Sequence, residues 1–345
     1  MRPVGPLTAA LSALLLVLLA PPTLLAESEF LRGMIISCPR AGQIWGTSTM
    51  AETLEEVRTL GVRWVAIHPY ARVLRDGTIR SRPAASVDYL QRATEMTREA
   101  GVGLFWKPHL AYWGSFEWRG DIEFGSDPDR WQRFFDGYRR FIVDQAQFAE
   151  AAGVELFAVG IEYEKTTQHE REWRQIISTV REVYRGKITY AANWDSLDKV
   201  PFWDAVDLIG VHAYFPLAET TDPDRAAIWR GWDGYLDQLQ ELAAHHQKPI
   251  LFAEIGYNRS HQAARRPWAH EIQDSPVSRA LRQRLLEVAL ERIEETAFVS
   301  GMFWWKWMPG EAPYDRDFSM KDPEARAALQ GSWAQRGEPT STSGQ

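Results

Sequence analysis

The chain has 345 residues, of which 45% are hydrophobic and 25% charged, a composition typical of globular proteins that argues against wholesale disorder and a multi-span membrane protein. Its 39 basic and 46 acidic residues give a formal charge of -7, the wrong sign for a protein that binds the phosphate backbone of nucleic acids. The single cysteine, Cys38, cannot form an internal disulfide, so burial has to stabilise the fold.

The first 26 residues have the order of a secretory signal peptide. Arg2 precedes an apolar run over residues 7–20, and a double proline is followed by Thr-Leu-Leu-Ala, which ends at Ala26. The run is shorter than the roughly 20 residues that span a membrane, which favours cleavage over an uncleaved anchor. We therefore expect a soluble mature protein, secreted or periplasmic, with no stable membrane insertion after cleavage.

Residues 27–335 alternate strand-like and helix-like patterns. The apolar runs that resemble buried parallel strands are 34–37, 64–68, 103–107, 156–160, 188–192, 208–211, 250–253 and 299–305. Helical patterns lie between them at 50–60, 87–100, 131–152, 170–184, 226–245 and 279–295. Gly61, Gly101 and Gly153 suit C-terminal helix caps, and Asp127-Pro128 and Ser275-Pro276 suit helix starts.

This alternation predicts the fold class. Eight strand and helix units close naturally into a (β/α)₈ TIM barrel, whereas a doubly wound sheet would carry a glycine-rich phosphate loop after its first strand, and no such loop is present. We predict an α/β protein with one catalytic barrel in residues 27–335, which includes a short C-terminal helical segment. Residues 336–345 are polar and rich in Gly, Pro, Ser and Thr, which predicts a disordered tail.

Active sites of such barrels lie at the C-terminal ends of the strands, so the residues there are the candidates. Glu162 and Glu254 each directly follow an apolar strand, and both are expected to face the barrel axis. One acid and one ionised carboxylate that flank a glycosidic bond are the minimum for glycoside hydrolysis, and a separation of about 5 to 5.5 Å permits a retaining mechanism. The alternative is that these glutamates cap a helix or pair with arginine.

Several motifs at these strand ends resemble the clan A glycoside hydrolases, and most closely family 113, whose known members are β-1,4-mannanases. They are Val-Gly-Ile-Glu-Tyr at 159–163, Phe-Ala-Glu-Ile-Gly at 252–256, Trp-Lys-Pro-His at 106–109, His-Ala-Tyr at 212–214 and Phe-Trp-Trp-Lys-Trp at 303–307. The resemblance covers most of residues 30–310 and implies that Glu162 is the acid/base and Glu254 the nucleophile. One departure is Ile161, where many clan A enzymes have an asparagine that binds the sugar 2-hydroxyl.

Other strand-end residues are candidates for binding the sugar or tuning the carboxylates. Tyr214 is placed to donate a hydrogen bond to Glu254 and keep it ionised, or else to act as an aromatic lid. Lys107, His109 and Asn193 are candidate hydroxyl ligands, with packing or solvation as the alternative for each.

Two choices among neighbouring residues stay open at this point. Glu164 competes with Glu162 for the acid role, because alternation along a strand puts both on one side. Trp305 is our choice for the platform beneath the cleaved sugar, but Trp304 or Trp307 would serve equally well on the pattern alone.

The resulting hypothesis is a secreted retaining hydrolase that cleaves a β-linked oligo- or polysaccharide. We predict mannan as the substrate, with another β-glycan as the alternative, and we predict no cofactor and no metal. A metal-dependent barrel hydrolase is a rival, because His68, His109 and His212 follow three strands. Its usual His-x-His pair on the first strand is missing here. A sugar-binding barrel without turnover is the third possibility, which Ile161 keeps open.

Overall fold

The computed structural model describes residues 30–310 and 317–334. The predicted signal peptide and the predicted C-terminal tail both lie outside these residues. Within the described ranges, no helix combines the length and the apolar character needed to cross a membrane.

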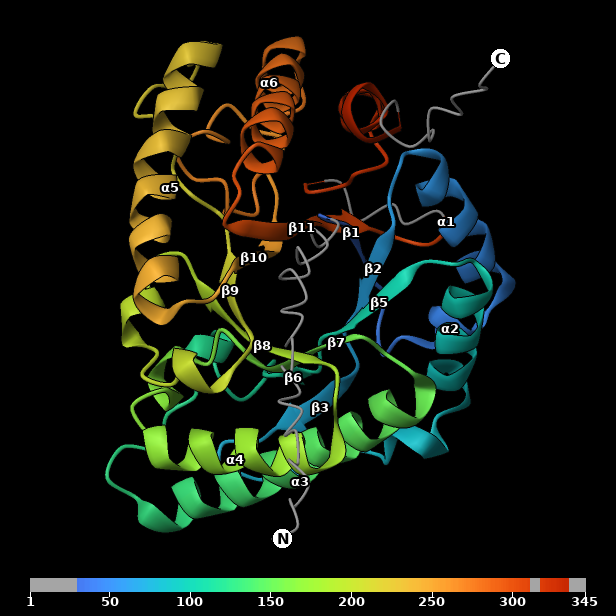
Figure 1. The fold of residues 1–345 in the computed structure, drawn as a ribbon, viewed down its shortest axis with the longest axis vertical. Helices are drawn as coiled ribbons and strands as arrows, with labels where there is room; N and C mark the ends of the chain where they lie inside the picture. Colours follow the sequence, from blue (N-terminus) through green and yellow to red (C-terminus); the bar gives the residue numbers. More distant parts are fainter. Residues whose placement is uncertain (1–29, 311–316, 335–345) are drawn as a thin grey trace, which may run out of the picture.

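Eight parallel strands close into a barrel, which confirms the predicted fold class (Figure 1). In the order of their hydrogen-bonded neighbours they are β1 (Leu31–Ile36), β11 (Val299–Trp307), β10 (Ile250–Ile255), β9 (Leu208–His212), β8 (Lys187–Asn193), β7 (Leu156–Ile161), β5 (Gly103–Trp106) and β2 (Trp64–Ile67), which pairs with β1 again. Every strand predicted from the apolar runs is present within a few residues of its expected bounds. The apolar runs are continuous because both faces of the barrel sheet are covered, one by the core and the other by the helices. In β7, for example, every residue is buried.

Helices surround the barrel (Figure 1). They are α1 (Ser48–Thr59), α2 (Asp88–Glu99), α3 (Pro128–Ala152), α4 (Glu170–Val183), α5 (Arg225–His246), α6 (Pro276–Glu294) and α7 (Pro323–Leu329). The connection between β8 and β9 departs from the repeating unit, because two 3-10 turns (Leu197–Lys199 and Trp203–Ala205) stand where an α-helix would complete it. The segment has only 14 residues and contains Pro201, which leaves little room for a helix.

The predicted helix ends are present. Asp127 and Ser275 each accept a backbone hydrogen bond from the third residue beyond them, as N-cap side chains do. Gly61, Gly101 and Gly153 have φ angles of 83°, 66° and 71°. This left-handed conformation suits glycine and ends the helix before the next strand.

A small second sheet, which the sequence patterns did not predict, continues beyond the barrel. Its strands are β3 (Tyr70–Val73), β4 (Ile79–Arg80) and β6 (His109–Ala111). Pro69 and Pro108 separate β3 and β6 from the barrel strands β2 and β5, and each piece is too short for a clear alternation. The sheet builds up the rim at the C-terminal ends of β2 and β5.

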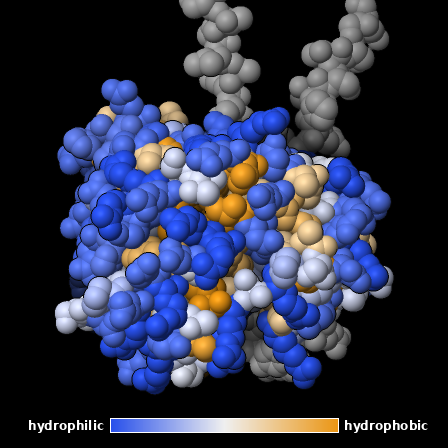
Figure 2. Space-filling model, turned by 90° about the horizontal axis from the view of Figure 1, so that it is seen from below, coloured by the Kyte–Doolittle hydropathy of each residue, from blue (hydrophilic) through white to orange (hydrophobic). Residues whose placement is uncertain are grey.

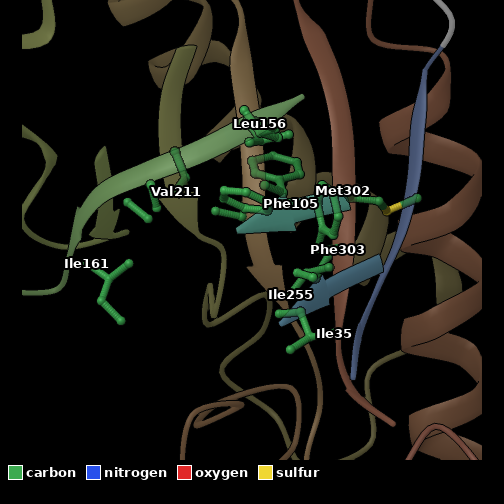
Figure 3. Packing of buried hydrophobic residues seen from close by; sticks show 14 of the residues in the cluster. Ile35, Phe105, Leu156, Ile161, Val211, Ile255, Met302 and Phe303 are labelled. Carbon is green, nitrogen blue, oxygen red and sulfur yellow. The ribbon is translucent and has the colours of Figure 1, made fainter. Parts of the chain in front are cut away.

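The barrel interior is a packed apolar core (Figure 3). The rings of Phe105 and Phe303 meet edge to face with centroids 5.0 Å apart. Gly33 makes room for them, because a Cβ there would lie 2.3 Å from the Phe303 ring. On the outside, Figure 2 shows a mostly hydrophilic face with smaller groups of hydrophobic residues near its middle. The functional groups are therefore expected above the core, at the barrel mouth.

Candidate active site

A cavity of about 550 Å³ lies at the C-terminal ends of the barrel strands, a size suited to a small ligand. Its walls include the predicted residues Glu162, Asn193, Tyr214, Glu254 and Trp305. The two other predicted residues, Lys107 and His109, are buried and do not line it. The structure thus brings both candidate carboxylates into one cavity with three of the five predicted sugar ligands.

The two carboxylates approach each other closely. Glu162 follows β7 and Glu254 lies on β10, and their side chains are only 13% and 7% exposed. One oxygen of each carboxylate and one ring nitrogen of His212 all lie within 4.8 Å of one another. Such a separation is close to the one that lets a carboxylate attack a sugar carbon directly.

The backbone turns sharply at Glu162. Its φ of 50° is a left-handed conformation that is uncommon outside glycine and costs on the order of 1 to 3 kcal/mol. Two contacts hold the turn: the Glu162 N–H donates to Ala191 O at 2.8 Å, and the Tyr163 N–H donates to the Tyr190 hydroxyl at 3.1 Å. As a result Ile161 stays in the core, with 0% exposure, while the next side chain reaches the cavity.

Two donors hold the Glu254 carboxylate. Lys107 Nζ donates to Oε1 at 2.8 Å and also to Ala253 O at 2.9 Å, and the Tyr214 hydroxyl donates to Oε2 at 3.2 Å. Burial acts to raise the pKa of Glu254, but the attraction of His212 and Lys107 outweighs it and lowers that pKa. Glu254 is therefore kept ionised, as a nucleophile needs to be.

His212 lies between the two carboxylates. Its Nδ1 is 2.6 Å from Glu162 Oε1, and its Nε2 is 3.5 Å from Glu254 Oε1. Arg119 adds positive charge, with Nη1 3.6 Å from Glu162 Oε2. Burial raises the pKa of Glu162, but His212, Arg119 and Lys107 together lower it to about 2. The cavity therefore contains two ionised carboxylates, and Lys107 and Arg119 compensate their charge.

The other two strand-end histidines lie apart from this pair. The rings of His68 and His109 stack with centroids 4.8 Å apart. Burial, followed by the charge of Lys107, lowers the pKa of His68 to about 3, and burial and Arg119 lower the pKa of His109 well below its usual value. Both imidazoles are therefore neutral.

The metal-site hypothesis named His68, His109 and His212 as ligands, and the structure does not support that set. Among residues 30–310 and 317–334, the donors that converge closely enough for a metal ion are Glu162, His212 and Glu254. The Lys107 ammonium already supplies a positive charge 2.8 Å from one of these carboxylates.

The structure distinguishes the alternatives that the sequence left open. Trp305 lines the cavity, whereas Trp304 and Trp307 are fully buried in the core. Glu164 turns away from the cavity and forms an ion pair with Lys199. Of the residues considered, Trp305 and Glu162 are the ones placed to meet a ligand.

The predicted site lacked several residues that contact the carboxylates or line the cavity. His212 had a detectable signal, because it ends β9 two residues before Tyr214, but we considered it only as a metal ligand. Arg119 lies in a 3-10 helix after β6 and has no sequence pattern to mark it. Trp194 and Asp195 follow the predicted strand β8, so they had the same signal as Glu162, but they were not selected. The remaining cavity residues come from chain segments without periodicity: Tyr112, Trp118, Trp268, His270 and Phe318.

Comparison with known proteins identifies the family. The model of Glycoside Hydrolase Family 113 matches residues 38–323. A family 113 β-mannanase from Alicyclobacillus acidocaldarius, solved in complex with ManMIm, is 25% identical, covers 89% of this chain and 98% of its own, and superposes with a TM-score of 0.75. A second family 113 β-1,4-mannanase is 22% identical, and the match covers 89% of this chain and 99% of the mannanase with a TM-score of 0.76. Fungal β-1,4-galactanases, at 14% identity, share the fold with a TM-score of 0.55. No curated protein matches the sequence. The chain belongs to glycoside hydrolase family 113.

Proposed function

We propose that this glycoside hydrolase cleaves a β-1,4-linked mannan with retention of the anomeric configuration, with Glu254 as nucleophile and Glu162 as acid/base. The observation that carries the proposal is the pair of carboxylates from β7 and β10, whose oxygens lie within 4.8 Å in a cavity of about 550 Å³. Family membership and the β-mannanase named above support mannan as the substrate.

In the first step Glu254 attacks the anomeric carbon, and the glycosidic oxygen leaves with a proton from Glu162. In the second step Glu162 takes a proton from water, which attacks the same carbon and releases Glu254. Lys107 and Tyr214 stabilise the ionised nucleophile before attack. They also stabilise it as a leaving group when the covalent intermediate is hydrolysed.

The acid step requires a protonated Glu162, although His212, Arg119 and Lys107 hold its pKa at about 2 in this structure. A bound sugar displaces water, and this desolvation favours the neutral carboxyl. The 2.6 Å contact with His212 Nδ1 gives Glu162 a partner for sharing a proton. We infer that substrate binding loads the proton onto Glu162 within this pair.

Asn193 and Trp305 are the proposed sugar ligands in the cavity. Trp305 offers a flat apolar surface on β11 for the sugar held at Glu254. Asn193 lies at the end of β8, and no hydrogen bond joins its side-chain amide to any residue of the described ranges. The oxygen and the nitrogen of the Asn193 amide are therefore both available for hydrogen bonds with sugar hydroxyls. His109 is better placed to support Arg119, which lies 3.3 Å from its Nδ1.

We also propose that residues 1–26 are a cleaved signal peptide, that 27–335 form the catalytic unit, and that the enzyme acts in the periplasm or outside the cell. N-terminal sequencing of the mature protein would locate the cleavage site.

The function is tested with mannan, glucan and xylan oligosaccharides, product sizing and anomer analysis by NMR. Glu254→Ala should abolish turnover and keep the fold. Glu162→Ala should slow oligosaccharides far more than substrates with good leaving groups, because only the former need an acid. Glu164→Ala is the matched control, since this nearby carboxylate pairs with Lys199 outside the cavity. Equal loss on both substrate types in Glu162→Ala, or an inverted anomer, would contradict the assignment.

A further inference from the structure

The cavity carries a pair of tryptophans in addition to the one assigned to the cleaved sugar. We propose that Trp268, together with Trp194, forms the platform for the sugar on the leaving-group side of the scissile bond. This inference rests on the proposed function and deepens it. Trp268 lines the cavity and is 43% exposed, which is unusual for so large an apolar side chain.

The loop that carries Trp268 is built to hold it in place. The buried Asn258 amide Nδ2 donates to three backbone carbonyls on either side of the tryptophan, at 2.8 Å to Arg266, 3.3 Å to Pro267 and 2.9 Å to Ala269. Its Oδ1 accepts from the Ser260 hydroxyl at 2.7 Å. A tryptophan fixed in an exposed position loses little conformational entropy when a ligand covers it.

The barrel order places this platform on the acid side of the bond. β7 lies opposite β11 in the closed ring, so a sugar stacked on Trp305 has the Glu162 carboxylate across the cavity from it. Glu162 has to protonate the oxygen that joins this sugar to the next one. Trp194 directly follows β8, the neighbour of β7. Trp268, from the loop after β10, contacts Trp194, so the next sugar comes to lie beside both indoles.

The two indoles contact each other and both line the cavity. Their ring centroids are 5.9 Å apart and their planes differ by 33°. Trp194 also packs edge to face with Phe215 and Tyr235, with centroids 6.1 Å and 5.8 Å away. The exposed Asp195 also lines the cavity and offers an acceptor for hydroxyls. Pyranoses present a C–H face to an aromatic ring and hydroxyls at the edge, which matches this arrangement.

The test compares Trp268→Ala with Trp113→Ala on two substrates. Trp113 is 56% exposed but does not line the cavity, so it controls for loss of a surface indole. One substrate is β-1,4-mannotetraose. The other is a β-mannosyl fluoride, whose leaving group is a single atom that does not occupy the platform. Trp268→Ala should lower kcat/KM on the tetrasaccharide about tenfold or more and change the fluoride reaction less than twofold. Trp113→Ala should change neither.

Equal losses on both substrates, or no loss on the tetrasaccharide, would overturn the platform. Binding separates this result from a failure of the proposed function. In a Glu254→Gln background, calorimetry should show about tenfold weaker tetrasaccharide binding with Trp268→Ala and unchanged binding with Trp113→Ala. If the wild type turns over no β-glycan but this binding difference holds, the proposed function fails, while Trp268 still forms a sugar-binding surface of the cavity. Equal binding by both variants overturns the platform.

Discussion

Lys107 provides the sharpest test of how the proposed nucleophile, Glu254, is tuned. Its ammonium lies 2.8 Å from Glu254 Oε1, and both side chains are almost fully buried. We predict that Lys107→Met raises the pKa of Glu254, because a major attraction that lowers this pKa disappears while the burial remains. A charge-assisted hydrogen bond contributes about 1.5 to 3 kcal/mol, which corresponds to about one to two pKa units.

The assay is the pH dependence of kcat/KM on an oligosaccharide. A carboxylate with a raised pKa becomes protonated at higher pH, so the acidic limb should move up by about one to two pH units. At the optimum, kcat/KM should fall about 10- to 100-fold, because the leaving carboxylate is also less stabilised. Lys107→Arg should recover part of the activity, and Lys165→Met serves as control, since Lys165 forms an exposed pair with Asp121. A folded Lys107→Met protein with an unmoved acidic limb would refute the reasoning.

Lys107→Met has a second readout that does not depend on activity. Removing one partner of a buried ion pair costs about 3 to 5 kcal/mol of stability, because the other charge is left without compensation. In a Glu254→Gln background that penalty should shrink, and urea unfolding of the four proteins measures the difference. Additive effects of the two substitutions would show that the pair is not energetically coupled.

Four further results follow from the same contacts. The pKa of His68 is about 3 in the folded protein and 6.5 ordinarily, so between these pH values the unfolded state binds one proton more than the folded state. The free energy of unfolding should therefore fall by about 1.4 kcal/mol for each pH unit below 6.5. Urea unfolding of His68→Leu should lack this contribution to the pH dependence of stability. Tyr214→Phe removes one hydrogen bond to Glu254 and should lower kcat/KM about tenfold, while the melting temperature should change by no more than a few degrees. Asn258→Ala frees the loop around Trp268 and should weaken tetrasaccharide cleavage while sparing the glycosyl fluoride, as seen by comparing the two kcat/KM values. Dialysis against EDTA should leave activity unchanged, because Lys107 rather than a metal ion compensates the carboxylates; loss of activity restored by zinc would favour a metal site.

The barrel was predictable because its signal is local. Each strand is a run of apolar residues, and glycine, aspartate or serine marks many of the helix ends. Glu162 and Glu254 were predictable for the same reason, since each directly follows such a run. Once the strands close into a barrel, their C-terminal ends have to meet.

The hydrogen bond from Tyr214 to Glu254 was predicted from the sequence. The rest of the support of the carboxylates was not, because it depends on which side chains meet across the barrel. Lys107 was expected to bind sugar hydroxyls, but its ammonium crosses the barrel axis to a residue 147 positions away in the chain. Arg119 reaches Glu162 from a loop of the small sheet, whose strands are interrupted by prolines. Periodicity reports which face of an element is buried, not which charged groups converge there.

Ile161 illustrates the difference between a motif and the geometry behind it. Many clan A enzymes have asparagine at this position. Because this chain has isoleucine instead, the sequence alone left open the hypothesis of a barrel that binds sugar without cleaving it. In the structure Ile161 is completely buried, and the left-handed turn at Glu162 separates it from the cavity. Asn193, at the end of the neighbouring strand β8, lines the cavity instead and pairs in register with His212, which contacts both carboxylates. Under the proposed function, the Asn193 amide binds the sugar held at Glu254, so the isoleucine removes a ligand from one position of the motif without removing an amide from the cavity.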